Sequence, residues 1–322
     1  MSKFRHILFT ILTLGLTLLL SGCKAVMLDP KGIIAADEKQ ILITAVGLML
    51  IVVIPVIILT FVIAWKYRAS NTKAKYTPEW SHSTILEIVW WTIPCVIILI
   101  LAVITWISSH QLDPYKPLDL KAKPVTIEVI ALDWKWLFIY PDQHIATVNF
   151  VELPVNVPVR FLITADAPMN SFQIPQLAGQ IYAMPGMQTK LNIMATATGD
   201  YAGMSANYSG VGFTYMNFIA RVATQEDFNK WVKTAQKSSD KLGMEAYNKL
   251  AMPTRNNPPE SFSAVADGLF NAIMMKYMMP GPAMKGMENK GMQDMHNKDY
   301  SSDRDYQSGY NKNNVPPTPV NN

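Results

Sequence analysis

Two long uninterrupted apolar stretches dominate the first third of the chain. Residues 41–65 carry no charged side chain, and residues 85–107 carry one, Glu87. A helix of about 20 apolar residues is long enough to cross the hydrocarbon core of a bilayer. Pro55 and Pro94 lie inside these stretches, and neighbouring helices tolerate such kinks. The pattern predicts a hairpin of two membrane-spanning helices.

After residue 107 the pattern changes to short alternating segments separated by Pro, Gly and Asn. Residues 134–140 place an aromatic side chain at every second position, which puts four aromatic rings on one face of a strand. Further strands are expected at 125–129, 147–153, 159–165, 180–184, 189–195 and 215–223. About 100 residues of this kind predict an all-β sandwich over residues 120–223.

A helical extension is expected after the sandwich, over residues 224–279. Residues 226–250 predict one helix, with Phe228 and Trp231 on the same side, and residues 262–278 predict a second.

The last segment, residues 280–322, is rich in Met, Gly, Asn, Asp and Lys and ends in a Pro-rich run. That composition cannot bury a core and predicts a disordered tail. Its soft side chains, together with one imidazole, are an alternative Cu(I) site, although their spacing does little to fix their geometry. They are Met284, Met287, Met292, Met295 and His296.

The chain begins with a pattern typical of a secretory signal, residues 1–22. Lys3 and Arg5 precede an apolar core, and Ser and Gly stand directly before Cys23. This ending resembles the lipobox of bacterial lipoproteins, in which cleavage precedes the Cys and its sulfur carries a diacylglycerol. The alternative is an uncleaved anchor with an incidental Cys. Lipidation would place the mature N-terminus outside the cytoplasmic membrane.

The connection between the two spans carries four basic residues against one acid, Glu79, which favours the cytoplasm. The flank at 23–40 also carries three lysines, so the lipobox decides the orientation. Residues 23–110 then begin outside the membrane with the lipidated N-terminus, cross it in the first span, turn in a cytoplasmic loop and return in the second span. The sandwich follows on the periplasmic side of a bacterial inner membrane.

Composition narrows the possible functions. Half of the 322 residues are hydrophobic, the net charge is only +4, and the basic residues are scattered, so nucleic-acid binding has no support. The two cysteines are Cys23 and Cys95, and none follows residue 95. The sandwich can therefore hold no thiolate metal site.

The segment 205–216 has the spacing of a dinuclear copper loop without its ligands. Such a site needs two thiolates four residues apart, followed by a His and a Met, because soft sulfur bridges the two ions. Ser205 and Ser209 stand at the thiolate positions, Phe213 at the His position and Met216 at the Met position.

Signal, hairpin, aromatic strand, sandwich and degenerate loop together resemble subunit II of haem–copper terminal oxidases, with the greatest similarity to the bo-type ubiquinol oxidases. The resemblance covers residues 23–278. Its most specific segments are 64–71, 133–136, 169–175 and 180–188. It implies a cupredoxin-like sandwich behind a transmembrane helix hairpin, with a C-terminal helical extension.

The resemblance also assigns the positions of the dinuclear copper centre found in the cytochrome c-oxidising branch. The positions of its two His, two Cys, one backbone-ligand Glu and one Met are occupied here by Asn170, Phe213, Ser205, Ser209, Asn207 and Met216. Five of these six ligands are changed. The resemblance therefore implies that this chain holds no metal and no redox centre.

By the same resemblance, the complex oxidises ubiquinol, reduces oxygen to water and moves protons outward. Haems, the haem-adjacent copper and the quinol site are expected in subunit I. The expected partners of this chain are subunit I, further subunits and membrane lipid. It would meet ubiquinol only through the complex.

Three residues have two interpretations each. The resemblance implies that Glu87 lies at the mouth of a proton-input channel. Charges inside a span are costly and usually functional, which agrees with such a role. The alternative is an acid that reaches the headgroup layer. Trp134 and Trp136 are expected to contact subunit I rather than to have a redox role, and the alternative is plain sandwich core. His82, His110 and His144 show no paired spacing and are interpreted as surface residues.

Two other classes of protein remain as alternatives. One is a copper-bearing cytochrome c oxidase subunit II, disfavoured by the missing thiolates. The other is a lipoprotein binding or sensor module with two spans and no enzyme partner, which would not bring haem with it on purification.

Overall fold

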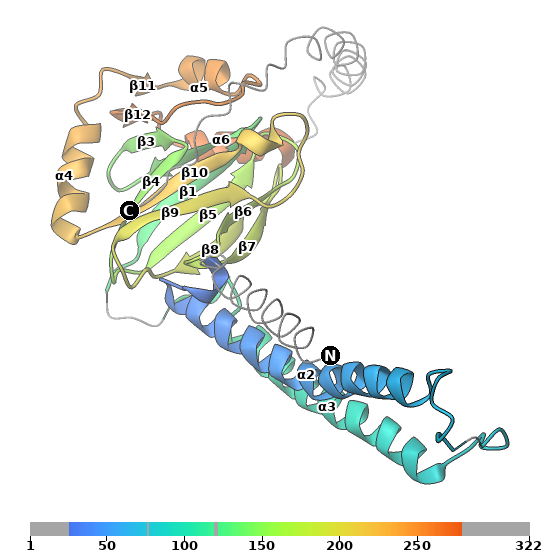
Figure 1. The fold of residues 1–322 in the computed structure, drawn as a ribbon. Helices are drawn as coiled ribbons and strands as arrows, with labels where there is room; N and C mark the ends of the chain where they lie inside the picture. Colours follow the sequence, from blue (N-terminus) through green and yellow to red (C-terminus); the bar gives the residue numbers. More distant parts are fainter. Residues whose placement is uncertain (1–25, 76, 119–121, 279–322) are drawn as a thin grey trace, which may run out of the picture. The chain divides into compact units, whose positions relative to one another are not determined.

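The computed structural model describes residues 26–75, 77–118 and 122–278 (Figure 1). Its first elements are η1 (Val26–Leu28), α2 (Ile33–Lys66) and α3 (Thr84–Gln111). The signal segment, Cys23 and the tail at 280–322 lie outside the described residues, so the predictions made for them stay predictions.

Helices α2 and α3 are both long and apolar enough to cross a membrane, by length and composition. They contain the predicted spans and continue through Pro55 and Pro94 without a break. None of the side chains in their most apolar stretches is buried within the chain. Exposing apolar surface to water costs roughly 25 cal/mol per Å². This surface therefore requires lipid or other protein around it.

Two sheets form the sandwich. The first has the strand order β12-β3-β2-β1-β5-β8 and the second β4-β10-β9-β6-β7. The strands of the first sheet are β1 (Val125–Leu132), β2 (Lys135–Tyr140), β3 (Ile145–Val148), β5 (Val159–Ala165), β8 (Thr189–Ile193) and β12 (Glu260–Phe262). Those of the second are β4 (Phe150–Pro154), β6 (Asn170–Ile174), β7 (Ala178–Ala183), β9 (Gly199–Ser205) and β10 (Asn217–Ala223).

Aromatic rings fill the space between the sheets. Strand β2 contributes Trp136 and Phe138, and the second sheet contributes Phe172 and Phe218. The ring centroids of Trp136 and Phe172 lie 5.3 Å apart, and those of Phe138 and Phe218 lie 5.1 Å apart. Edge-to-face and tilted pairs of this kind add stability beyond the area they bury. Three of the four aromatic residues predicted for one face of this strand, Trp136, Phe138 and Tyr140, thus lie in this core.

The other face of β2 is covered as well. Leu137 and Ile139 pack against a second core formed with the C-terminal extension, in which Tyr247 and Phe270 are buried. The elements of this extension are α4 (Gln225–Ala235), β11 (Lys241–Leu242), α5 (Met244–Leu250), β13 (Ala264–Val265) and α6 (Leu269–Met278). Every residue of β2 is therefore buried.

A buried lysine joins this strand to the extension. The Lys135 ammonium donates to the carbonyl oxygens of Leu250 and Met252, at 2.7 and 2.8 Å. Helix α5 ends at Leu250, and the last carbonyls of a helix lack intrahelical partners and carry partial negative charge. Lys135 therefore caps α5 while its aliphatic stem lies in the second core.

Four details of the sequence prediction are wrong. The helix predicted over 262–278 begins only at Leu269, because residues 264–265 form strand β13. The helix predicted over 226–250 is two helices, since residues 241–242 pair with β13 instead. The strand predicted over 147–153 is β3 and β4, separated by Asn149 in the left-handed region (φ 54°) where the chain passes from one sheet to the other. Trp134 also has a positive φ (63°) and lies in the turn before β2, outside the aromatic face.

The first turn of α2 is attached to the sandwich by backbone hydrogen bonds. The Gly32 amide donates to the Gln176 carbonyl at 3.0 Å, and the Thr196 amide donates to the Lys31 carbonyl at 2.7 Å. A Cβ at Gly32 would overlap the backbone of Leu177. Only glycine permits this close approach.

Candidate functional site

The six positions of the predicted vestigial copper centre lie close together. Asn170 begins β6, Ser205 ends β9, and Met216 directly precedes β10. The other three lie in the loop between β9 and β10. Strand β6 pairs with β9 through Phe172 and Ser205, which brings the first position next to the loop.

Hydrogen bonds within the chain hold the polar members of this group. Ser205 Oγ lies 3.0 Å from Asn170 Oδ1 and 3.2 Å from the Asn207 carbonyl oxygen, so its proton is directed at acceptors inside the group. The Asn207 side-chain amide donates to the Met169 carbonyl at 3.0 Å. Asn170 and Ser205 are both buried. These atoms are already engaged with one another.

The remaining members supply no better ligands. The Ser209 hydroxyl is buried and has no hydrogen-bond partner among the described residues. The Phe213 ring lies beside Tyr208, with centroids 5.7 Å apart. Met216 is fully buried. A thioether alone is a weak ligand.

The donor set does not fit a dinuclear copper centre. Hydroxyl and amide groups are hard, neutral ligands, whereas copper in such a centre takes thiolate and imidazole. Across the described ranges, no group of three or more His, Cys, Asp or Glu residues is placed to hold a metal ion. The arrangement is a hydrogen-bonded and apolar cluster with the outline of a metal site.

Trp134 holds the loop in place. Its indole nitrogen donates to the Ser209 carbonyl oxygen at 3.1 Å. Its ring lies so close to Gly212 that a Cβ there would overlap it. The Arg255 guanidinium lies 5.5 Å from the centroid on the indole, within the range of a cation–π contact. The turn that carries Trp134 thus holds the loop by contacts from outside it.

The two tryptophans expected to contact another subunit differ in exposure. Trp134 is half-buried, while Trp136 has no exposed surface and packs between Phe172 and Phe218. Of these two tryptophans, only Trp134 therefore offers surface to a partner. Its contact with subunit I stays a prediction.

Glu87 lies in the first turn of α3 and has a partner that sequence reasoning missed. Its Oε1 lies 2.7 Å from His82 Nδ1, and both side chains are more than half exposed. The other imidazole nitrogen lies 3.2 Å from the Thr84 hydroxyl. Both ring nitrogens of His82 are thus engaged, which fixes the orientation of the imidazole.

The signal for this pair is present in the sequence. Ser83 is the N-cap of α3, so His82 and Glu87 occupy the positions just before the cap and four residues after it. Side chains at these two positions commonly meet across the first turn of a helix. The pattern is usually sought with apolar residues, and here it joins an imidazole and a carboxylate.

Two acids outside these sites have strongly raised pKa values. Glu152, in β4, is buried, and burial raises its pKa to about 7, although the nearby Arg221 guanidinium acts in the opposite direction. Burial also raises the pKa of Glu128, in β1, to about 6. Neither carboxyl contacts the loop or Glu87 through any hydrogen bond or ion pair identified in the described part of the chain.

Two family models match this chain and define its class. The "Cytochrome C oxidase subunit II, periplasmic domain" matches residues 141–223, and the "COX Aromatic Rich Motif" matches residues 236–281. The first contains the six copper positions, and the second contains α5, β12 and α6. The fold is the cupredoxin-like sandwich of oxidase subunit II, with two apolar helices before it.

Similar proteins identify the family within this class. The chain is 53% identical over 296 residues to "Cytochrome bo(3) ubiquinol oxidase subunit 2" of Pseudomonas putida, covering 92% of this chain and 94% of the relative. It is 52% identical over 266 residues to "Ubiquinol oxidase subunit 2" of Acetobacter aceti, covering 82% and 86%. The chain belongs to the ubiquinol oxidase subunit 2 family, and it is an inner-membrane protein with a periplasmic domain.

Among solved structures, the periplasmic domain of subunit II of cytochrome oxidase from Bradyrhizobium japonicum is similar to this chain. The TM-score is 0.35 at 26% sequence identity, over 37% of this chain and 98% of that one.

Proposed function

We propose that the chain is the non-redox subunit II of a proton-pumping ubiquinol oxidase. In that complex, ubiquinol is oxidised, oxygen is reduced to water and protons move outward. Haems and copper lie in subunit I, and electrons enter from a donor dissolved in the membrane. This chain contributes scaffold, a periplasmic cap and one proton entrance. The names of its relatives support the assignment to ubiquinol chemistry.

One observation carries the proposal. The Ser205 hydroxyl and the Asn170 amide, at positions where copper would need a thiolate and an imidazole, are hydrogen-bonded to each other. An electron-entry centre cannot operate with these side chains, because neither binds copper ions tightly nor changes redox state. A soluble cytochrome therefore has no acceptor on this domain.

The test compares the purified complex with a rebuilt variant. The unaltered complex should oxidise ubiquinol, fail to oxidise reduced cytochrome c, and show no thiolate-to-copper absorption. The rebuilt variant carries Asn170→His, Ser205→Cys, Asn207→Glu, Ser209→Cys and Phe213→His. It should gain two copper ions per complex. Ser209→Cys alone is the control, since a single thiol cannot bridge two ions. Rapid cytochrome c oxidation by the unaltered complex would overturn the proposal.

Glu87 is the proton entrance in this proposal. A carboxylate at the inner end of a span can collect protons from the cytoplasm and pass them inward. His82 supports the role because its ring nitrogen lies 2.7 Å from the carboxylate, and an imidazole can both donate and accept a proton. The pair would load protons at the mouth of the path.

Replacing Glu87 tests this role directly. Glu87→Ala should slow oxygen reduction by about tenfold or more without preventing assembly, and Glu87→Asp should retain part of the rate. Glu79→Ala, an exposed acid of the same connection, is the matched control. Turnover of Glu87→Ala at the unaltered rate across pH would support the alternative of an interfacial acid.

The proposal also includes a lipid anchor at Cys23. The Leu-Ser-Gly-Cys ending after an apolar core supports cleavage before Cys23 and attachment of diacylglycerol to its sulfur. Intact mass spectrometry should find a mature chain that begins at Cys23 with lipid mass added. A chain that begins at Met1 without added mass would exclude the anchor.

A further inference from the structure

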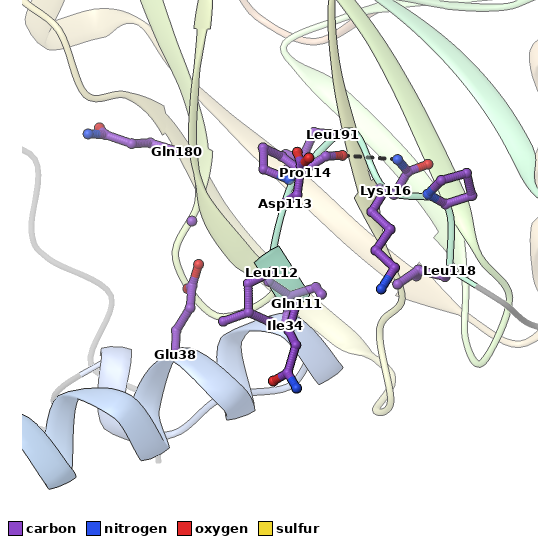
Figure 2. Close-up of a pocket in the computed structure, with 13 residues that line it drawn as sticks. Ile34, Glu38, Gln111, Leu112, Asp113, Pro114, Lys116, Leu118, Gln180 and Leu191 are labelled. Atoms are coloured by element: carbon purple, nitrogen blue, oxygen red, sulfur yellow. Dashed lines mark hydrogen bonds between the residues drawn. The ribbon is translucent and has the colours of Figure 1, made fainter. Parts of the chain in front are cut away.

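A cavity of about 290 Å³ lies between the start of α2, the segment that leaves α3 and the β7–β8 side of the sandwich (Figure 2). Glu38 enters it from α2, Asp113 and Lys116 from the segment after α3, and Asn192 from β8. Leu112 and Leu118 add apolar wall. None of the functions proposed above uses this cavity.

The Glu38 carboxylate is held at the wall of the cavity. It is half-buried and accepts a hydrogen bond from the backbone amide of Gly179. A Cβ at Gly179 would lie 2.5 Å from Glu38 Oε1, so the absence of a side chain there admits the carboxylate. No ion pair to Glu38 is found in the part of the chain that the structure describes.

The other charged groups of the cavity can also form further hydrogen bonds or ion pairs. One oxygen of Asp113 accepts from the Tyr115 amide at 2.9 Å, which leaves the second oxygen available. Lys116 is exposed, and no ion pair to its ammonium occurs among the described residues. The cavity thus offers two carboxylates and one ammonium that do not neutralise one another. The complementary ligand carries both a cation that donates hydrogen bonds and an anion.

The depth of the cavity restricts the source of that ligand. Glu38 precedes the predicted start of the first span by about one turn, and Gln111 follows the predicted end of the second by about one turn. At a rise of about 1.5 Å per residue, both lie some 5 Å beyond the hydrocarbon core. The headgroup layer of a bilayer leaflet occupies roughly this zone, about 5–7 Å thick.

We propose that this cavity binds the headgroup of a phosphatidylethanolamine molecule from the outer leaflet. The lipid ammonium donates to Glu38 and Asp113, and the lipid phosphate accepts from Lys116. The acyl chains continue beside the exposed apolar sides of α2 and α3. Phosphatidylcholine is excluded because its quaternary ammonium has no N–H to donate. Phosphatidylglycerol is disfavoured because the carboxylates outnumber the lysine.

The test measures lipid retained by the whole purified complex. The complex is equilibrated with vesicles of equal parts phosphatidylethanolamine and phosphatidylcholine, then released into mild detergent and analysed by native mass spectrometry. The unaltered complex should retain phosphatidylethanolamine. Glu38→Gln and Lys116→Gln should each reduce its occupancy by about tenfold, the effect of losing one charge-assisted hydrogen bond. Gly179→Ala, which displaces the carboxylate, should do the same.

Two controls make the same chemical changes at the same depth. Asp37 and Lys39 flank Glu38 on α2 and do not line the cavity. Asp37→Asn and Lys39→Gln should leave the retained lipid unchanged. Ubiquinol oxidase activity in detergent verifies that each variant has assembled, independently of lipid binding. If Glu38→Gln fails this check, Glu38→Asp replaces it, and that variant should retain the lipid at reduced occupancy.

Three results would overturn the proposal. The first is equal retention in cavity variants and controls. The second is preferential retention of phosphatidylcholine, or displacement of the lipid by soluble phosphoethanolamine at the same concentration, which would identify a water-soluble ligand. The third is an unaltered complex without lipid in which Glu38 resists carbodiimide labelling, which would show that a protein subunit covers the cavity.

Discussion

The aromatic core of the sandwich and the loop at 206–216 are stabilised by opposite means. In the core, Trp136, Phe138, Phe172 and Phe218 contact one another ring to ring across the two sheets. The loop buries few of its own side chains. It is held by single contacts from outside it, chiefly from the Trp134 indole. The core is a redundant set of contacts, whereas the loop depends on a few.

This difference explains how the copper ligands can change without loss of the fold. A metal bound by a preformed site adds its binding free energy to folding. Here the loop conformation is maintained by an indole stacked on glycine and by the hydrogen bonds around Ser205. The sheets beneath have their own apolar core, so the ligand positions are free to differ.

The largest predicted effect comes from breaking the core. Phe172→Ala removes a fully buried ring that contacts Trp136, Phe138, Phe161 and Phe218. The free energy of unfolding should fall by about 3–5 kcal/mol. Denaturant melting of the purified chain in detergent, followed by tryptophan fluorescence, measures it. Tyr208→Ala, an exposed aromatic of the loop, should shift the midpoint little.

A smaller effect should come from releasing the loop. Trp134→Ala removes the stacked indole and its hydrogen bond, and should cost about 2–3 kcal/mol because the ring is half-buried. Hydrogen exchange should rise across the loop amides while the amides of β6 and β10 stay protected. Equal loss of protection in loop and strands would show that the loop and the core unfold as one cooperative unit and are not stabilised independently.

Glu152 provides a test of how much the burial of a carboxyl group within the sheets lowers the free energy of unfolding. Its pKa is about 7 in the folded chain and near 4.5 when unfolded, so the folded state binds the proton more tightly. Its contribution to stability is therefore largest below pH 4.5, declines as the pH rises from 4.5 to 7, and is lost above pH 7. Glu152→Gln should remove this decline and stabilise the chain by an amount on the order of 2 kcal/mol at pH 8.

The control for this pH effect is Glu226→Gln, since Glu226 is an exposed acid on α4. Its stability difference from the unaltered chain, measured over the same pH range, is the baseline for that of Glu152→Gln. If Glu152→Gln gives a difference that is constant from pH 5 to pH 8, burial does not raise the pKa of this carboxyl in the folded chain.

The smallest effects should distinguish the two serines that stand at copper positions. Ser205→Ala removes a hydroxyl hydrogen-bonded inside the cluster and should destabilise by about 1 kcal/mol. Ser209→Ala removes a buried hydroxyl that lacks a partner among the described residues, and should be neutral or stabilising by up to about 1 kcal/mol. Melts of the two variants at one pH give the comparison. Equal destabilisation would mean that Ser209 has a bound water or another partner.

The sequence predicts the parts of the fold that depend on periodicity. The apolar stretches predict α2 and α3, and alternation predicts β2, with Trp136 and Phe138 on its core face. The relation among the copper positions follows from their spacing and from the resemblance to oxidase subunit II. These features depend on short-range patterns that burial imposes on a strand or a helix.

Other features depend on contacts between distant segments. The helix expected at 226–250 breaks because residues 241–242 find a partner strand some twenty residues further on. Asn149 divides one expected strand in two, and its side chain accepts from the Trp136 amide and donates to the Asn257 carbonyl. The pairing of His82 with Glu87 depends on where α3 begins, and the hydrophobic pattern alone does not mark that residue.

The attachment of α2 to the sandwich imposes an order on biogenesis. The Lys31 carbonyl accepts from Thr196, 165 residues later in the chain, and the Asp29 carbonyl accepts from the Gln176 side chain, 147 residues later. At roughly 5–20 residues per second, synthesis separates these partners by about 10–30 s. During that interval the first exported residues have no partner, while α2 and α3 already enter the bilayer. The junction between membrane helix and sandwich is therefore among the last contacts to form, and any factor that protects it must act on the periplasmic side.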